Sequence, residues 1–195
     1  MNRRPFLAAL GCAVLLTWMR PARSGGTIEV EQALLDVSHP DDLVLLSADF
    51  VLSLTETLRD AVNRGLPLYF LTEVQIQRGR WYWLDETLVS TQIEWRLSYH
   101  ALTRQFRVAS SGRSDSFESL EEAIAALSSV KRWQVAPLSR FQAGTAYMVW
   151  VRMRLDTTRL PKPFQMAALT DRDWNPESEW KRFAFTAPTT PTSAQ

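Results

Sequence analysis

The sequence predicts a mainly β protein, an antiparallel β-sandwich of about seven or eight strands with two short helices. The strongest observation is the stretch 66–102, where apolar residues occupy alternate positions on both sides of a polar and aromatic string at 78–85. A period of two over this length is typical of half-buried strands, and the turn formers between the two segments favour an antiparallel hairpin. The other two observations are a second clean alternation at 145–156 and the short spacing between the remaining strand-like segments.

Another hairpin is expected near the start of the chain. Residues 27–36 alternate, and after a turn at 39–42 residues 43–52 form an apolar run typical of a buried strand. By contrast, residues 110–115 are rich in Ser and charged side chains, which indicates a solvated loop. Shorter strands are expected around Phe106 and Val108, within 131–138 and at 181–185.

Two helix starts are each marked by a Ser followed three residues later by a Glu. The pairs Ser53/Glu56 and Ser119/Glu122 have the spacing of a capping box, in which both side chains bind backbone N–H groups of the first turn. Two prolines within 160–165 instead predict an extended connector, because proline lacks an N–H and restricts the residue before it. If both helices covered one face of an antiparallel sheet, the fold would be α+β, which is the alternative to a sandwich.

Residues 1–24 are predicted to be an export signal peptide. Arg3 and Arg4 precede an apolar run at 6–18, and small residues before Gly25 provide a cleavage site. The arginine pair also resembles a twin-arginine signal. Paired arginines are common in ordinary signals, however, so the general secretory route is favoured and the expected location is the periplasm or another exported location.

The rest of the chain is predicted to be one β-rich domain at 27–186 with a disordered tail at 187–195, because the tail is mostly Thr, Pro, Ser and Ala. Removal of residues 1–24 takes away four arginines and no acid, so the net charge changes from +1 to −3. A mildly acidic domain is a poor candidate for binding nucleic acid or an anionic membrane face. We therefore expect no nucleic-acid partner, and membrane contact only through an uncleaved signal segment.

Enzyme chemistry has little support in the sequence, and we assign no catalytic residue, no metal ligand and no cofactor. The only cysteine, Cys12, lies in the signal segment, and neither His39 nor His100 belongs to a motif for a nucleophile or a zinc site. Residues 171–179 carry oxygen side chains at alternate positions, as a calcium loop does. Because Pro176 stands where an EF-hand requires glycine, a solvated turn is the preferred interpretation.

Two groups of residues are candidates for a binding site. The first is an aromatic platform that could stack against a sugar or a peptide, since flat rings offer apolar area and a π face. Its members are Arg78, Arg80, Trp81, Tyr82 and Trp83. The same tryptophans could instead close the end of the β core, which is the favoured interpretation.

The second candidate is a polar sheet face of mixed charge. If the strands pair as neighbours, its members are Glu73, Gln75, Glu94, Arg96, Arg107, Arg152 and Arg154. Such a face most often provides solubility and weak cross-strand pairs. It could equally dock a protein partner, with arginine supplying the anchors.

Five strings in a fixed order resemble an exported bacterial family described only as a domain of unknown function. Two of them are Arg-Trp-Tyr-Trp at 80–83 and Leu-Pro-Lys-Pro-Phe-Gln at 160–165, and the others lie at 97–104, 151–156 and 174–180. The resemblance covers about 28–183. It implies a signal peptide followed by one envelope domain, and a gene often found near a membrane sensor kinase of the nitrogen-regulation type, but no catalytic or binding residues.

Together these observations favour a non-catalytic, exported envelope protein that binds another protein, with the membrane sensor kinase as a candidate partner. The alternative is a binder of a small ligand or glycan that uses the platform around Trp81 and Trp83. Enzyme activity is left open and is not favoured.

Overall fold

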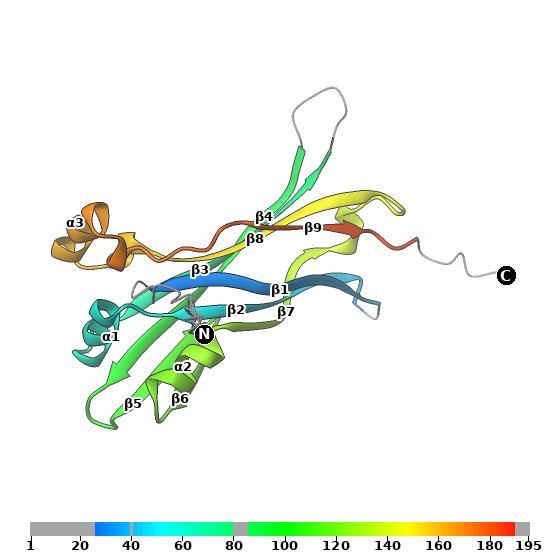
Figure 1. Ribbon diagram of the computed structural model, residues 1–195. Coiled ribbons are helices and arrows are strands. Elements are labelled where there is room, and N and C mark those ends of the chain that lie inside the picture. Colours follow the sequence, from blue (N-terminus) through cyan, green and yellow to red (C-terminus); the bar gives the residue numbers. More distant parts are fainter. Residues whose placement is uncertain (1–25, 40, 80–85, 190–195) are drawn as a thin grey trace, which may run out of the picture.

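The computed structural model describes residues 26–39, 41–79 and 86–189, which form two antiparallel sheets facing each other (Figure 1). The three-stranded sheet has the order β1-β2-β7, that is β1 (Thr27–Ser38), β2 (Leu43–Ser53) and β7 (Ser129–Pro137). The six-stranded sheet has the order β6-β5-β4-β3-β8-β9, that is β6 (Arg113–Phe117), β5 (Gln105–Ser110), β4 (Glu86–His100), β3 (Leu68–Arg78), β8 (Ala146–Leu155) and β9 (Lys181–Thr186). The predicted mainly β fold with two sheets is confirmed, with nine strands in the described residues rather than seven or eight.

The predicted central hairpin is formed by β3 and β4, whose register runs from Leu68 opposite Leu97 to Arg78 opposite Glu86. On its other side β3 pairs with β8, so β3 lies in the interior of the larger sheet. Its even-numbered residues face the smaller sheet, and most of its odd-numbered residues face outward. This parity decides which side chains are available on the outer surface.

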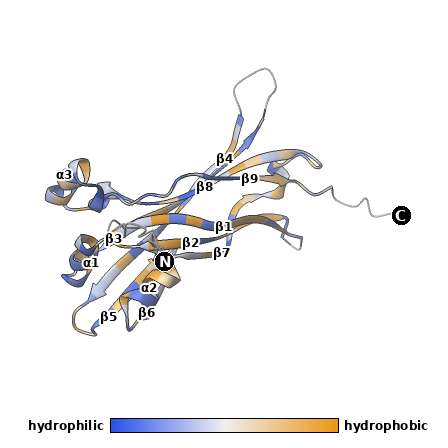
Figure 2. Cartoon of the chain, in the orientation of Figure 1, coloured by the Kyte–Doolittle hydropathy of each residue, from blue (hydrophilic) through white to orange (hydrophobic). Residues whose placement is uncertain are grey.

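Apolar side chains of both sheets meet in one core between the layers. Phe70 and Ile76 of β3 and Val151 and Met153 of β8 are fully buried there. Figure 2 shows the resulting alternation of hydrophobic and hydrophilic residues along several strands. Such alternation is expected of antiparallel sheets with one face in the core and the other toward water.

In the described residues three α-helices and three short 3₁₀ helices lie between the strands: α1 (Glu56–Asn63), α2 (Leu120–Leu127), α3 (Lys162–Thr170), η1 (Leu138–Arg140), η2 (Thr157–Arg159) and η3 (Arg172–Trp174). The predicted cap of α2 is confirmed, because Ser119 Oγ accepts a hydrogen bond from the N–H of Glu122 at 3.1 Å. The predicted cap of α1 is wrong. Ser53 ends β2, and Thr55 caps the helix instead, accepting from Leu58 N–H at 3.1 Å.

The proline-rich segment at 160–165 is not an extended connector throughout. Pro161 is the N-cap of α3, and Pro163 lies in the first turn of that helix. A helix tolerates proline at this position because the first-turn N–H groups have no partner within the helix. The prediction failed because it considered proline only in a helix interior.

The segment 110–115 is not a loop, because it contains the end of β5, a two-residue hairpin turn and the first residues of β6. Ser110 pairs with Arg113, and the two turn residues Ser111 and Gly112 have φ angles of 47° and 82°. Two consecutive positive φ angles are typical of the tight turns that suit the twist of a hairpin. Because β6 is an edge strand with mostly exposed polar residues, it shows no apolar alternation in the sequence.

The last part of the chain runs along β8. Ser178 Oγ accepts from Met153 N–H at 3.0 Å, and Ser178 N–H donates to the Met153 carbonyl at 2.9 Å. The expected edge strand at 181–185 then follows as β9. Ala187, at the start of the expected tail, is buried and bonded to Thr145 through its backbone, while residues 190–195 and the expected signal at 1–24 lie outside the described residues.

No helix in the described part of the chain is both long enough and apolar enough to span a bilayer.

Candidate functional site

The structure places the two predicted groups of site residues differently. Arg78 ends β3 and forms an ion pair with Glu86 of β4, its register partner, at 2.9 Å. Arg80, Trp81, Tyr82 and Trp83 lie outside the described residues, so the aromatic platform stays a prediction. Arg152 and Arg154 lie on β8 with side chains on the outer face of the six-stranded sheet.

The outer position of these arginines follows from the alternation along β8. Tyr147, Val149 and Val151 face the core, so Trp150, Arg152 and Arg154 face outward. In the neighbouring strand, Glu73 stands directly opposite Arg152. The sheet register therefore brings one carboxylate between two guanidinium groups.

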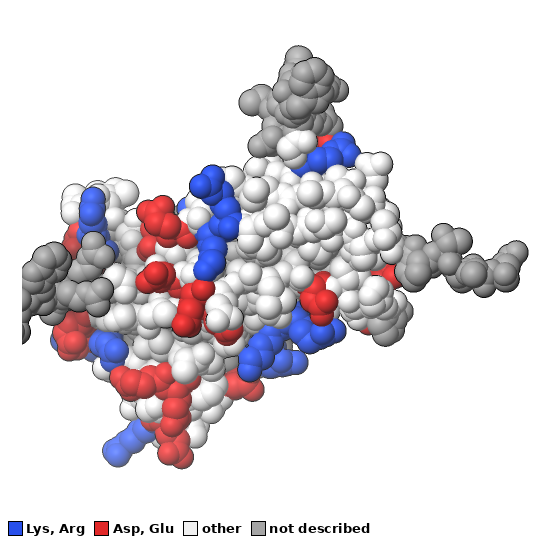
Figure 3. Space-filling model, turned by 45° about the vertical axis from the view of Figure 1, so that its right-hand side comes forward, with Lys and Arg blue, Asp and Glu red and all other residues white. Residues whose placement is uncertain are grey.

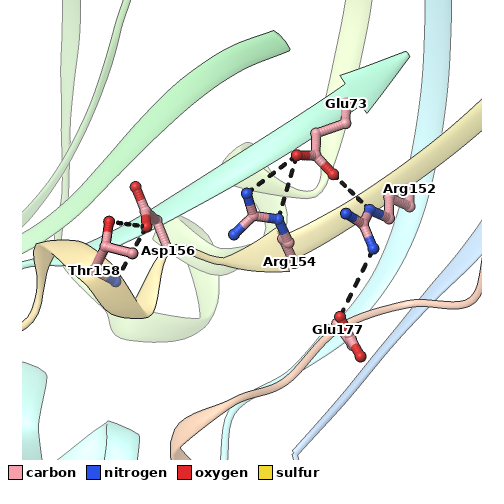
Figure 4. A network of polar contacts seen from close by, with 6 residues as sticks. All are labelled: Glu73, Arg152, Arg154, Asp156, Thr158 and Glu177. Atoms are coloured by element: carbon pink, nitrogen blue, oxygen red, sulfur yellow. Dashed lines mark hydrogen bonds and ion pairs between the residues drawn. The ribbon is translucent and has the colours of Figure 1, made fainter. Parts of the chain in front are cut away.

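Glu73 binds both arginines (Figure 4). Its Oε2 accepts from Arg152 Nε at 2.5 Å, and its Oε1 accepts from Arg154 Nη2 at 3.1 Å. Arg152 also lies 3.8 Å from a carboxylate oxygen of Glu177. The Glu73 side chain is only 16% exposed, compared with 25% for Arg152 and 27% for Arg154, so the network is partly shielded from water.

The network keeps Glu73 ionised. Burial of the carboxyl group raises the pKa of Glu73, but hydrogen bonds and positive charges from Arg154 and Arg152 more than offset burial, so the pKa lies below its ordinary value of 4.5. At neutral pH the three side chains carry one negative and two positive charges. Glu177, 3.8 Å from Arg152, adds a second negative charge, so the charges of the four side chains balance.

Two tryptophans extend this network. The Arg152 guanidinium lies 4.4 Å from the ring centroid of Trp180, and Arg182 lies 5.0 Å from that of Trp150. The two indoles meet edge to face at 6.5 Å and 85°. Rings and guanidinium groups in such positions attract each other through the ring quadrupole, which fixes their orientation.

We call this surface the arginine–tryptophan face. It consists of Glu73, Trp150, Arg152, Arg154, Trp180 and Arg182. Sequence reasoning placed Glu73 and the two β8 arginines together but missed Trp180 and Arg182. The signal that it lacked is the pairing of β8 with β9, which puts Arg182 opposite Trp150 and cannot be read from local periodicity.

A hollow of about 550 Å³ adjoins the arginine–tryptophan face. Its lining includes Trp150 and Arg182 together with Met148, Gln77 and Ala184. Met148 is 42% exposed, and the indole N–H of Trp150 is buried without a hydrogen-bond partner in the described residues. The hollow therefore offers an apolar side chain next to a positive charge.

A second polar cluster continues the outer surface toward η2. Arg159 Nη2 lies 2.6 Å from both carboxylate oxygens of Glu94, and its guanidinium lies 4.6 Å from the ring centroid of Tyr69. Arg96 approaches the same ring at 6.0 Å. Leu71, the register partner of Glu94, is only 4% exposed although it occupies an outward position, so the outer face carries packed side chains here.

The charged groups of the arginine–tryptophan face are better suited to binding than to acid–base chemistry. Guanidinium groups keep their protons at all physiological pH values, and Glu73 is held ionised, so these groups are poorly matched to proton transfer. Among the described residues, no group of three or more His, Cys, Asp or Glu side chains is arranged to hold a metal ion. In the segment considered for calcium, Asp171 Oδ1 instead accepts from Asp173 N–H and caps η3.

The model of a sequence family described as a domain of unknown function (DUF4390) matches residues 26–184. No curated protein and no solved structure matches the chain. Since the match includes nearly all of the two sheets, the chain belongs to the DUF4390 family.

Proposed function

We propose that this chain is an exported envelope protein that binds another protein through the arginine–tryptophan face. The observation that supports the proposal is the fixed arrangement of two tryptophans and three arginines beside a hollow on an outward sheet surface. Tryptophan and arginine are the residues most enriched among those that dominate binding energy in protein interfaces. Their presence together on one outward surface distinguishes this region from the surrounding polar surface.

The side chains of the face are already held in position before binding. Glu73 fixes Arg152 and Arg154, and Arg152 in turn stacks on Trp180. A side chain that is ordered in the free protein loses less conformational entropy on association. Preorganisation of this kind favours recognition of a protein surface over a purely solubilising role.

The charges of the face favour a partner that presents an acidic side chain next to an apolar one. Three arginines stand against Glu73 and the more distant Glu177, and Arg182 has no ion-pair partner within the described residues. The exposed side chain of Met148 in the adjoining hollow provides the apolar contact. Figure 3 shows Lys and Arg beside Asp and Glu in small groups, which suits a protein better than a polyanion such as nucleic acid.

Export and the identity of the partner belong to the same proposal. The charged start, apolar run and small residues of 1–24 support passage across the inner membrane. The gene neighbourhood implied by the family resemblance makes the extracytoplasmic part of a membrane sensor kinase the first partner to test. Cell fractionation should find a shortened chain in the envelope fraction, and a full-length chain in the cytosol would contradict export.

Site-specific photo-crosslinking in living cells tests the binding surface. A photoreactive amino acid at Met148, beside the face, should give a discrete crosslinked product. The same amino acid at Gln32, an exposed position of β1 in the other sheet, should not give this product. Identical products at both positions, or no product at Met148, would contradict the proposal.

A further inference from the structure

A cleft lies between the two layers, on the side where the larger sheet is wider than the smaller one. β7 forms one edge of the three-stranded sheet, whereas the six-stranded sheet continues through β4 to β5 and β6. Helix α2 contacts β4, β5, β6 and β7 and covers part of this continuation (Figure 1). Between these elements the structure has a cleft of about 330 Å³. This is at the small end of the range for ligand pockets, about 300–1,000 Å³.

Two tryptophans from different sheets line the cleft. Trp95 comes from β4 and Trp133 from β7, and both are half-buried. The indole N–H of Trp95 donates to Thr72 Oγ1 at 3.2 Å, and Thr72 is fully buried, so the ring is held by the core. Indole rings that are only partly covered offer apolar and π surface to a flat or branched apolar group.

One buried hydroxyl group of the cleft lacks a hydrogen bond. Ser110 lines the cleft, and its Oγ is buried without a partner within the described residues. Buried polar groups are nearly always hydrogen-bonded, because an unmade bond is costly. Rotation of the Ser110 side chain toward the cleft would let a bound molecule supply the missing hydrogen bond.

Most of the charged side chains that line the cleft are positive. Arg113, Lys131 and Arg132 contribute three cations, against one acid, Asp115. Arg132 lies 3.8 Å from Asp36, whereas Arg113 and Lys131 have no ion-pair partner in the part of the chain that the structure describes. Two unpaired cations in one cleft favour a ligand with a negative charge.

The two cations of β7 are placed by a β-bulge. Val130 stands opposite Ala48 and Trp133 opposite Leu46, so Lys131 and Arg132 together oppose the single residue Ser47. Arg132 has a φ of 50°, a left-handed conformation that is unfavourable for a residue with a side chain. Bulges change the direction of the side chains around them and are frequent next to binding sites.

From these observations we infer that the cleft binds a small amphipathic anion. The apolar body of the ligand lies against Trp95 and Trp133, its carboxylate or phosphate contacts Arg113 and Lys131, and a polar atom bonds to Ser110 Oγ. This site is separate from the arginine–tryptophan face and does not depend on it. The cleft also differs from the platform expected around Trp81 and Trp83, because its two tryptophans are Trp95 of β4 and Trp133 of β7.

Calorimetric titration tests the inference on the chain without residues 1–24. Three probes are used that share the same naphthalene ring and differ in the polar group. The probes are 1-naphthaleneacetate, 1-naphthyl phosphate and the uncharged 1-naphthalenemethanol. One or both anions should bind with a Kd below 1 mM, at least about tenfold more tightly than the alcohol, since about 1.4 kcal/mol corresponds to tenfold. The two anions distinguish a carboxylate from a phosphate head group.

Variants of the cleft give the second part of the test. Arg113→Gln and Lys131→Gln should each weaken anion binding at least about fivefold, whereas the matched surface variant Arg64→Gln should leave it unchanged. Ser110→Ala should weaken binding about threefold and raise the Tm of the free protein, because it removes an unpaired buried hydroxyl. Saturable binding that is equal for the anions and the alcohol, binding unaffected by Arg113→Gln and Lys131→Gln, or no binding at 10 mM probe would each overturn the inference.

Discussion

The two faces of β8 show how one strand serves both stability and recognition. Its inward residues are at most 2% exposed and pack in the core: Tyr147, Val149, Val151, Met153 and Leu155. Its outward residues Trp150, Arg152 and Arg154 are partly exposed and are held by ion pairs and ring contacts. Adjacent residues of the same strand therefore respond to different forces, burial on one side and charge and ring contacts on the other.

Substitutions on the two faces of β8 should therefore have different effects. An inward substitution removes apolar contacts and lowers the free energy of unfolding. An outward substitution changes the binding surface at a smaller cost in stability, and Glu73 is intermediate because its charge is partly buried. The following variants test this order from the largest expected effect to the smallest.

Met153→Ala should have the largest effect on stability. Met153 is fully buried, and loss of its side chain should lower the free energy of unfolding by about 2–5 kcal/mol, as seen for large-to-small core substitutions. Denaturant unfolding followed by fluorescence measures the change. Met148→Ala is the matched control on the same strand, and because Met148 is 42% exposed its loss should stay below about 1 kcal/mol. Equal losses for the two variants would contradict the assignment of faces.

Glu73→Gln should have an intermediate effect. The substitution leaves Arg152 and Arg154 partly buried without their shared counter-charge, so the free energy of unfolding should fall by about 1–3 kcal/mol. Glu121→Gln is the control, because the Glu121 pair with Arg59 lies on the surface and should contribute much less. A larger loss for Glu121→Gln than for Glu73→Gln would show that the network does not stabilise the fold.

The same network predicts a pH dependence of stability. Because the folded pKa of Glu73 lies below its ordinary value of 4.5, the ionised network stabilises the fold fully above that value. The contribution is then lost as the pH falls below 4.5 and through the folded pKa. The difference in unfolding free energy between the wild type and Glu73→Gln should therefore be constant at neutral pH and shrink in acid. A difference that grows as the pH falls would mean that Glu73 is not held ionised.

Controls aside, Trp180→Ala should have a smaller effect on stability than Met153→Ala and Glu73→Gln. It removes the cation–π contact with Arg152 and the edge contact with Trp150, which together contribute about 1 kcal/mol. Its effect on crosslinking from Met148 should be large, since Trp180 belongs to the proposed binding face. Trp180→Phe keeps a ring in place and should retain part of the crosslinking. If Trp180→Ala unfolds the protein while crosslinking persists in the folded fraction, the ring serves the core and not the partner.

Local sequence patterns predicted most of the fold. Alternation along 66–102 and 145–156 identified β3, β4 and β8, and Ser119 with Glu122 located the start of α2. The misses concern contacts between distant segments. Thr55 rather than Ser53 caps α1, and its hydroxyl also donates to the Asp173 carbonyl, a contact across 118 residues that no local pattern contains.

The same limit applies to the candidate site. Strand parity was enough to place Glu73, Arg152 and Arg154 on one face, because each follows from alternation within its own strand. Trp180 and Arg182 join them only through the pairing of β8 with β9. The cleft was missed for a similar reason, since Trp95 and Trp133 meet only when two sheets stack.

The yield of photo-crosslinking from Met148 in the Arg182→Glu variant tests the proposed binding face most directly. Arg182 is exposed and stacks on Trp150, so its reversal to Glu changes the charge of the face without removing a core contact. With an acidic partner the yield should fall at least about tenfold, whereas Arg64→Glu at the C-cap of α1 should leave it unchanged. Equal yields in the two variants would contradict the claim that the outer surface of β8 and β9 is where this protein binds its partner.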